Sequence, residues 1–263
     1  MAAVASPIPA GFMAGVTTDA PWQPLAECGY DNPFFYHCYA EDFDENSKTL
    51  SNVYTVTATG TGAAVAAQAG EGGQALFTAG TTAGNSSIQL PFASFRANRA
   101  PKKLFFNARL QATAAALTTA TLSLVCGLIQ LTATPGTVTD GVWFNISNGV
   151  VSINSAVGSV ITTVNLPSSI VTAAVVANTF FDLGFYVNRQ GDVLAFLDTQ
   201  LVGYIPQSNL GTTGNPQATG AVARITAPAA TAVNLTPTMG IVQGGTTAGA
   251  TMTVDFFGAY QER

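Results

Sequence analysis

The residues best suited to chemistry form one acidic segment near the N-terminus, Glu41-Asp42-Phe43-Asp44-Glu45. Retaining glycoside hydrolases use two carboxyl groups about 5 Å apart, and a strand can supply them when both point to the same side. Here the alternating positions are Glu41, Phe43 and Glu45, so a phenylalanine stands where the central acid would lie. We therefore interpret the segment as structural, with Phe43 anchored in the core, and we expect the chain not to be an enzyme.

Motifs for nucleophilic catalysis and phosphate binding are missing from the sequence. Its single histidine, His37, lies near the N-terminus, and no Gly-x-Ser-x-Gly elbow is present to hold a nucleophilic serine. The glycine-rich stretches Gly60-Thr61-Gly62 and Gly70–Gly73 lack the lysine and the helix that follow a phosphate-binding loop. We expect neither a catalytic residue nor a cofactor.

Candidate metal ligands are few and badly spaced. Cys28 and Cys38 flank His37, but a zinc site needs four ligands at tighter spacing. Calcium ligands would come from loop aspartates, which are scattered and have turn roles of their own: Asp140, Asp192 and Asp198. We therefore expect no bound metal, and the sequence leaves open whether Cys28 and Cys38 pair.

Low charge is the feature that most restricts the function. Only 9% of the residues are charged, against about 25% in an ordinary soluble domain, and no charged residue lies between Gly141 and Phe181. Polar residues interrupt this stretch, so no apolar run reaches the ~18 residues of a membrane span. The net charge of −5 argues against nucleic-acid binding. Because little charge repulsion opposes association, we expect a homo-oligomer, and a closed trimer is the preferred state.

The first forty residues differ in composition from the rest and predict an extended N-terminal arm, residues 1–40. They hold five of the 13 prolines, a density that disfavours helices and interior strands. Their many aromatic residues distinguish them from a disordered tail. The arm either folds back onto its own domain or docks on a neighbouring molecule. The candidate interface anchors are Phe12, Trp22, Phe34, Phe35, Tyr36 and Tyr39.

From Glu41 onward, alternating apolar and polar residues predict about a dozen short antiparallel strands, separated by turn signals such as Asn148-Gly149. Ser168–Val176 is expected to form one short helix with Ser168 as its N-cap. Residues 41–263 are therefore expected to form one all-β domain, an antiparallel jelly-roll β-sandwich. The expected strands are Val53–Thr59, Gln74–Ala79, Ser87–Phe92, Lys103–Leu110, Thr121–Leu131, Val142–Ile146, Val150–Ile153, Ser159–Val164, Phe180–Asn188, Asp192–Asp198, Gln200–Ile205, Thr238–Val242 and Thr251–Tyr260.

Several segments carry a recognisable pattern in their order along the chain. Phe180–Val187 followed by Gly191–Gly203 resembles the hairpin of concanavalin A-like and laminin-G-like jelly rolls, with Thr199-Gln200 where such hairpins have an Asp-Gly turn. The remaining segments are Asn32-Pro33-Phe34, Tyr39–Asp44, Gly72–Leu76, Lys103–Arg109, Asp140–Phe144, Val254–Phe257 and Gln261–Arg263. Together they resemble the head decoration (cement) proteins of tailed bacteriophages, over about residues 32–263.

This resemblance implies a structural role in the virion. The protein would be made in the cytoplasm of the bacterial host. It would seat a concanavalin A-like jelly roll on the outer capsid surface, bound to the major capsid protein and often trimeric. The resemblance supplies no catalytic residues. The alternative is a glycan-binding, lectin-like module of a tail fibre or spike, with Asp140 and Trp143 as the candidate sugar contacts.

Overall fold

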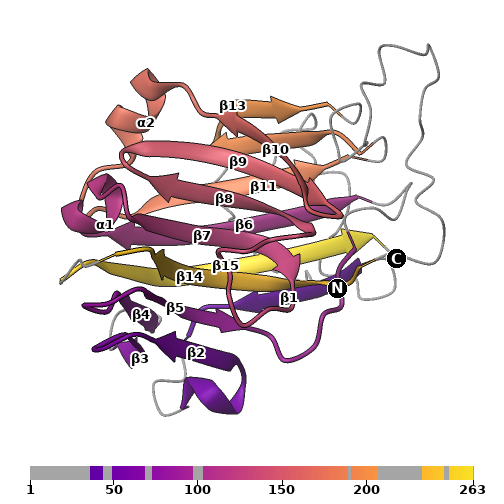
Figure 1. Cartoon of the computed structure of the whole chain (residues 1–263). Helices are drawn as coiled ribbons and strands as arrows, with labels where there is room; N and C mark the ends of the chain where they lie inside the picture. Colours follow the sequence, from indigo (N-terminus) through magenta and orange to yellow (C-terminus); the bar gives the residue numbers. More distant parts are fainter. Residues whose placement is uncertain are drawn as a thin grey trace, which may run out of the picture.

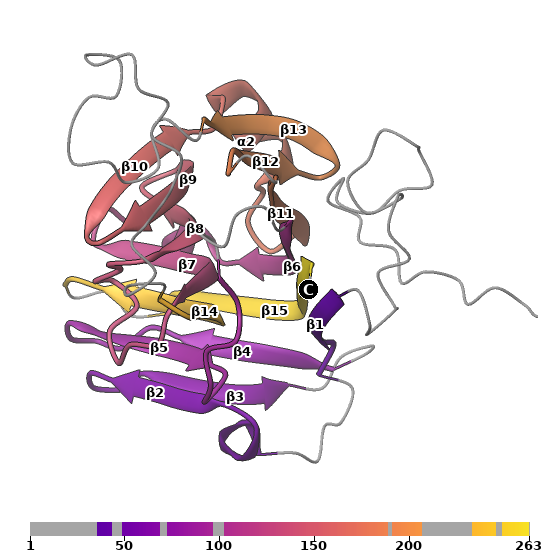
Figure 2. The ribbon, with the colours of Figure 1, turned by 90° about the vertical axis from the view of Figure 1, so that its right-hand side faces the viewer.

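The computed structural model describes residues 36–43, 49–68, 73–96, 103–188, 191–206, 233–245 and 249–262. They form two β-sheets packed face to face (Figures 1 and 2). Sheet A has the strand order β13-β12-β11-β6-β15-β4-β3, with β1 beside β15, and sheet B the order β10-β9-β8-β7-β14-β5-β2. Every strand pair is antiparallel. The prediction of an all-β antiparallel sandwich is confirmed.

The strands of sheet A are β1 (Tyr36–Glu41), β3 (Ala64–Gln68), β4 (Gln74–Thr78), β6 (Leu104–Ala112), β11 (Phe181–Val187), β12 (Val193–Leu197), β13 (Gln200–Ile205) and β15 (Thr251–Glu262). Those of sheet B are β2 (Thr55–Thr59), β5 (Gly84–Gln89), β7 (Leu122–Gln130), β8 (Gly141–Ser147), β9 (Val150–Val157), β10 (Val160–Asn165) and β14 (Leu235–Gln243).

The main hydrophobic core lies between the two sheets and follows the period of two. On β6, the alternate residues Leu104, Phe106, Ala108 and Leu110 all belong to this core cluster. Phe106 stacks on Phe185 of the neighbouring strand β11, with ring centroids 5.2 Å apart. Successive side chains of a strand point to opposite faces, so the residues between these four face outward from the sandwich.

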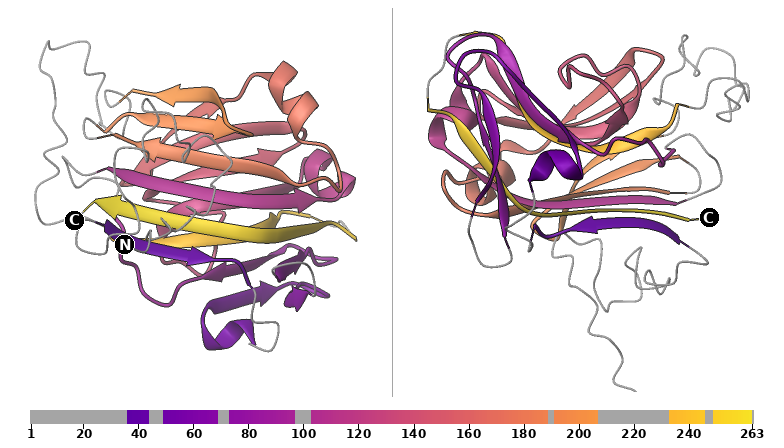
Figure 3. Two further views of the ribbon diagram at one scale, coloured as in Figure 1. Left: turned by 180° about the vertical axis from the view of Figure 1, so that it is seen from behind. Right: turned by 90° about the horizontal axis from the view of Figure 1, so that it is seen from below.

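Strand β15 lies at the centre of sheet A and has neighbours on both sides (Figure 3). One side pairs with β6, while the other side pairs first with β4 and then, beyond a bulge next to Asp255, with β1. β1 begins at Tyr36, inside the segment predicted as an arm, so residues 36–40 are part of sheet A. Among the described strands, β1 pairs with β15 alone.

Three short helical segments complete the described fold: η1 (Leu50–Asn52), α1 (Ala114–Thr118) and α2 (Ser168–Ala174). The predicted helix at Ser168 is present, but Ser168 is its first helical residue and not its cap. Pro167 occupies the N-cap position, and its carbonyl accepts the N–H groups of Ile170 and Val171 at 3.0 Å each. In the part of the chain that the structure describes, no helix is long and apolar enough to cross a membrane.

Candidate interaction surfaces

The acidic segment begins at the end of β1, where it closes the sandwich. The Glu41 carboxylate accepts hydrogen bonds from the Tyr54 hydroxyl at 2.7 Å and from the Phe43 backbone N–H at 2.9 Å. The Tyr39 hydroxyl lies 2.6 Å from that of Tyr54. Phe43 is buried against Tyr54 and Phe257, with ring centroids 6.4 and 5.8 Å apart. The predicted core role of Phe43 is confirmed.

The two phenols of this junction are protonated at neutral pH, as tyrosines ordinarily are, and burial shifts their pKa values further upward. It raises the pKa of Tyr39 to about 12, and the neighbouring Glu41 carboxylate adds to the effect. Burial and the hydrogen bonds to Tyr39 and Glu41 raise the pKa of Tyr54 further. Both hydroxyls therefore keep their protons, and the Glu41 carboxylate serves as their shared acceptor. This arrangement ties β1 to the domain.

The predicted arm anchors divide into two groups. Tyr39 packs against its own domain, with its ring centroid 5.7 Å from that of Phe257, and so follows the fold-back alternative. The backbone of Tyr36 pairs with Glu262 on β15. The other predicted anchors lie outside the described residues, as does Cys28: Phe12, Trp22, Phe34 and Phe35.

The sugar contacts predicted for a lectin do not form an open site. Trp143 points away from the main core but is only 6% exposed. It belongs to a smaller buried cluster on the outer face of sheet B with Val125, Ile129, Ala156 and Val138. Val138 comes from the loop between β7 and β8, so this loop contributes to the cluster beside the tryptophan. Trp143 is therefore a packing residue, which corrects the expectation that a sugar ring would stack on it.

Asp140, its predicted partner, has a structural role in the turns of sheet B. Its carboxylate accepts the Gly158 backbone N–H at 3.0 Å, next to the turn between β9 and β10. Its own N–H donates to the Gln130 side-chain oxygen at 3.2 Å, and its carbonyl accepts the Gln130 N–H at 2.9 Å. These bonds close the loop between β7 and β8.

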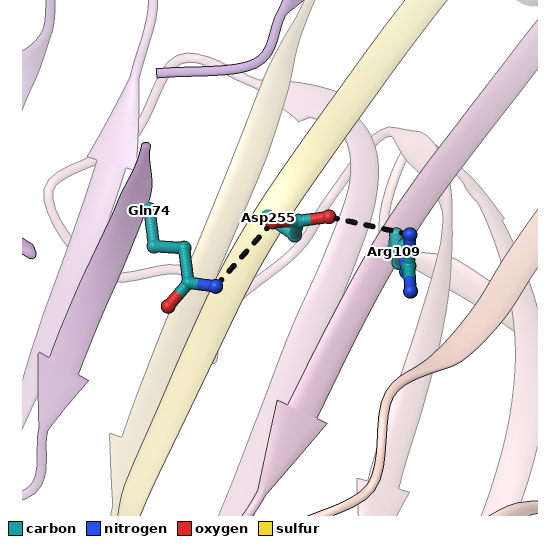
Figure 4. Close-up of polar contacts among 3 residues, drawn as sticks. All are labelled: Gln74, Arg109 and Asp255. Carbon is teal, nitrogen blue, oxygen red and sulfur yellow. Dashed lines mark hydrogen bonds and ion pairs between the residues drawn. The ribbon is translucent and has the colours of Figure 1, made fainter. Parts of the chain in front are cut away.

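On the outer face of sheet A, the Asp255 carboxylate lies between Arg109 and Gln74 (Figure 4). The Arg109 guanidinium is 3.6 Å from one Asp255 oxygen, and the Gln74 amide donates to the other at 3.4 Å. On β11, the Asp182 backbone N–H donates to the Asp198 carboxylate at 2.8 Å. Burial raises the pKa of Asp182 to about 6, against the opposing effect of Arg109. Within the described ranges, no three His, Cys, Asp or Glu side chains are placed to hold a metal ion.

The end of the sandwich where β10 and β13 lie has an unusual surface (Figures 1 and 2). Each of these strands is the last of its sheet among the described strands, and neither contains a charged residue. Ile161 of β10 is 50% exposed, and Leu201 and Tyr204 of β13 are 56% and 52% exposed. Natural edge strands are usually protected by charges, prolines or bulges. Here both strands lack charges and prolines, and the pairing of β12 with β13 has a register shift between Ala195 and Phe196. We call this surface the β10–β13 edge.

The sequence analysis did not predict the β10–β13 edge, because its residues form no motif for catalysis, metal binding or sugar binding. The available signal was the absence of charge in both strands, together with large apolar residues at Ile161 and Leu201. The sequence could not say that β10 and β13 end their sheets, since strand order depends on contacts between distant segments.

No protein-family model and no curated protein sequence matches the chain. Its fold is similar to that of an endo-1,3-β-glucanase from Streptomyces sioyaensis, with 14% identity and a TM-score of 0.55, covering 88% of this chain and 98% of that one. It is also similar to the carbohydrate recognition domain of Emp47p, with 8% identity, a TM-score of 0.51 and coverage of 87% and 97%. A carbohydrate esterase from Shiga toxin-encoding bacteriophage phi24B has 11% identity, a TM-score of 0.50 and coverage of 84% and 96%. The chain therefore has the jelly-roll sandwich fold of the concanavalin A-like lectin type.

Proposed function

We propose that this chain is a non-enzymatic structural protein of a bacteriophage virion, a decoration or cement protein on the outer capsid surface. Its partner is the major capsid protein, and it is made in the cytoplasm of the bacterial host. The order of the sequence motifs over residues 32–263 supports this proposal. The structural observation that most favours the proposal is the β10–β13 edge, which combines exposed apolar side chains with two uncharged strands.

The chemistry of the edge fits a permanent structural contact. Ile161, Leu201 and Tyr204 offer apolar area that contact with a partner would remove from water. Among the described strands, β10 and β13 each have a neighbour on one side only, and edge strands of this kind can extend a partner's sheet or accept its side chains. Neither strand carries a charge, so covering them desolvates no ion of their own, and the nearby Asp192 carboxylate is hydrogen-bonded to Tyr204.

The placement of the carboxylates also supports a role without catalysis. Glu41 and Asp140 are engaged in hydrogen bonds that hold turns and strands together. Asp255 pairs with Arg109 on a sheet face, and Asp198 accepts a backbone N–H from Asp182. Each of these groups has a structural partner. A glycoside hydrolase would instead need an acid and a second carboxylate facing one substrate.

A decoration protein stabilises a shell by binding the assembled state more tightly than the free subunits. The purified protein should therefore co-sediment with expanded heads of its own phage and bind unexpanded heads less. Ile161→Lys should lower head binding at least tenfold, because a lysine would be buried without a partner at the edge (about 1.4 kcal/mol per factor of ten).

The matched control is Phe92→Lys, which changes another exposed apolar residue, in the turn after β5. It should leave head binding unchanged. Equal loss in both variants, or no association of the wild-type protein with heads, would contradict the proposal.

We further propose that the protein assembles as a closed trimer. The strands at the opposite end of the sandwich, β2 and β3, are also uncharged and form the other edges of the two sheets. With the β10–β13 edge on the capsid protein, this second edge is left for contacts between copies that close into a ring. Light scattering at micromolar concentration should give the mass of three chains, whereas a clean monomer there and isolated copies on the virion would contradict a trimer.

A glycan-binding module is the second candidate, and the outer face of sheet B favours it. Asn145 and Thr163 present neutral polar side chains there, on the strands either side of β9, whose Ser152 and Asn154 lie between them and are only 5% exposed. Amides and hydroxyls both donate and accept, as sugar hydroxyls require. Glycan-array binding that Asn145→Ala abolishes, without association with heads, would favour this candidate over the first.

A further inference from the structure

We infer that the outer face of sheet A is a docking surface for the N-terminal segment of the same chain, residues 22–35. The face carries an aromatic cluster, which we call the outer cluster. Its buried members are Phe105, Phe196 and Tyr260, and the partly buried residues packed against them are Tyr186, Leu194 and Phe256. The cluster extends over β15, β6, β11 and β12, which are consecutive strands of the sheet.

The outer cluster faces away from the main core. Phe105 lies between Leu104 and Phe106 on β6, and both of these belong to the core between the sheets. Phe105 must therefore point to the opposite side, where it stacks on Tyr186 with ring centroids 4.7 Å apart. Phe105 is nevertheless 0% exposed. A fully buried phenylalanine on the outside of a two-layer sandwich calls for a third layer of chain above it.

The side chain of Asn107, next to the outer cluster, is a second sign that a further segment lies over this face. Asn107 follows Phe105 on the same face and is 2% exposed. Its Cα partners on the two neighbouring strands are Gly184 and Gly258, so no side chain stands on either side of it. Its side-chain oxygen accepts no hydrogen bond in the part of the chain that the structure describes. Buried acceptors are rarely left unpaired, and a backbone N–H of a segment lying across the two glycines would supply the donor.

The path of the chain identifies the segment. β1 lies beside β15 at the margin of the outer cluster, with Cys38 as the Cα partner of Tyr260 and Tyr36 as that of Glu262. From Tyr36, β12 is four strands away across the sheet, or about 19 Å at ~4.8 Å per strand. Residues 22–35 can span this distance even when bent, because an extended chain covers ~3.3 Å per residue.

The composition of the segment suits the surface. Trp22, Phe34 and Phe35 match an aromatic face, and Pro24 and Pro33 lack N–H groups that burial would leave unpaired. A segment tethered next to its site has an effective concentration in the millimolar range, which favours its own face over that of a second copy. The occupant is therefore the N-terminal segment of the same chain.

Trp22 is a natural probe of this docking in the full-length protein. Trp143→Phe leaves Trp22 as the single tryptophan of the chain. In this background, Trp22 should emit in the blue and resist acrylamide, and both properties should stay constant on dilution from micromolar to nanomolar protein. Leu194→Lys places a charge at the far end of the outer cluster, and it should raise acrylamide quenching several-fold while the far-ultraviolet spectrum stays that of a β-sandwich.

Two further variants keep the test decisive. Tyr186→Ser removes a stacking partner without adding charge and should act like Leu194→Lys, so it replaces that variant if the latter fails to fold. Ile161→Lys is the matched control on the other sheet and should leave Trp22 protected. Three results would overturn the inference: a wild-type Trp22 as quenchable as free tryptophan, equal quenching in all variants, or protection that disappears on dilution. The last would assign the surface to the segment of a second copy.

Discussion

The outer faces of the two sheets differ sharply, although both belong to one sandwich. Sheet A carries large aromatic side chains at one end and Arg109 with its aspartates at the other. Sheet B carries small neutral side chains, such as Ser152 and Asn154, beside the buried Trp143. On sheet B, Val138 of the β7–β8 loop belongs to the same buried cluster as the tryptophan and packs beside it.

The difference separates two uses of a sheet surface. On sheet B, Ser152 and Asn154 are also buried, at 5% exposure each, but their polar atoms bond to one another: Asn154 donates to the Ser152 hydroxyl at 3.2 Å and accepts from Thr163 at 2.6 Å. A face of phenylalanines and tyrosines is stable only when something covers it. Outer aromatic residues in such a sandwich therefore mark where a further segment or molecule lies.

The largest expected effect comes from two adjacent phenylalanines on opposite faces of β6. Phe106→Ala should destabilise the protein by about 3–5 kcal/mol, because it empties the core between the sheets. Phe105→Ala should cost a similar amount if a third layer closes the outer cluster. Urea unfolding of both variants measures this. A loss below about 1 kcal/mol for Phe105→Ala would mean that the outer face of sheet A is open to water.

Trp143→Ala measures how much the buried cluster on the outer face of sheet B contributes to the stability of the protein. Its expected cost is about 3 kcal/mol, since the tryptophan fills a smaller cluster and is nearly fully buried. Head binding of the folded variant should be unchanged, and Trp143→Phe is the conservative control. Loss of glycan binding with unaltered thermal stability would instead return Trp143 to the role of a sugar contact.

The charged end of sheet A predicts a dependence on pH. The pKa of Asp182 is raised from 3.8 to about 6, chiefly by burial. As pH rises from about 4 to 6, the unfolded chain loses this proton before the folded protein does, so the folded state loses stability. Asp182→Asn should remove the cost of holding an ionised carboxylate in a partly buried position. We expect it to stabilise the protein by about 1 kcal/mol at pH 7, after allowance for solvent screening. Thermal unfolding at pH 4 should show no such gain, and an equal gain at both values would refute the assignment.

The smallest expected effect belongs to the ion pair beside it. Asp255→Asn should cost less than about 1 kcal/mol, because Arg109 is half exposed and the pair is screened by water and salt. Urea unfolding at low and high salt measures the difference. A loss of several kcal/mol would show that Asp255 is buried under a further layer, and the docking surface would then extend over this end of sheet A as well.

Turn signals and alternating residues in the sequence predicted the hairpins, because a hairpin depends on residues that are close together in the chain. The Asn148-Gly149 signal marks the turn between β8 and β9, where both residues have positive φ, at 52° and 74°. The turn between β12 and β13 is tight even without the usual glycine, because Asp198 and Thr199 adopt φ of 44° and 72°. The predicted strands around both turns are present in the structure.

Pairings between distant segments could not be predicted in the same way. The β1 segment appeared as part of an arm because prolines and aromatic residues precede it, and its partner β15 lies at the other end of the chain. Alternation around Trp143 could not tell which face of its strand the side chain occupies, or that a loop supplies Val138 beside it. The β10–β13 edge is likewise a product of strand order.

A density map of the virion decides between capsid decoration and glycan binding. For a decoration protein, we expect copies of this jelly roll on the outside of the head, with β10 and β13 against the major capsid protein and three copies around each attachment point. Absence of the sandwich from the head, with matching density on a tail fibre or spike, would contradict this expectation and favour the glycan-binding alternative.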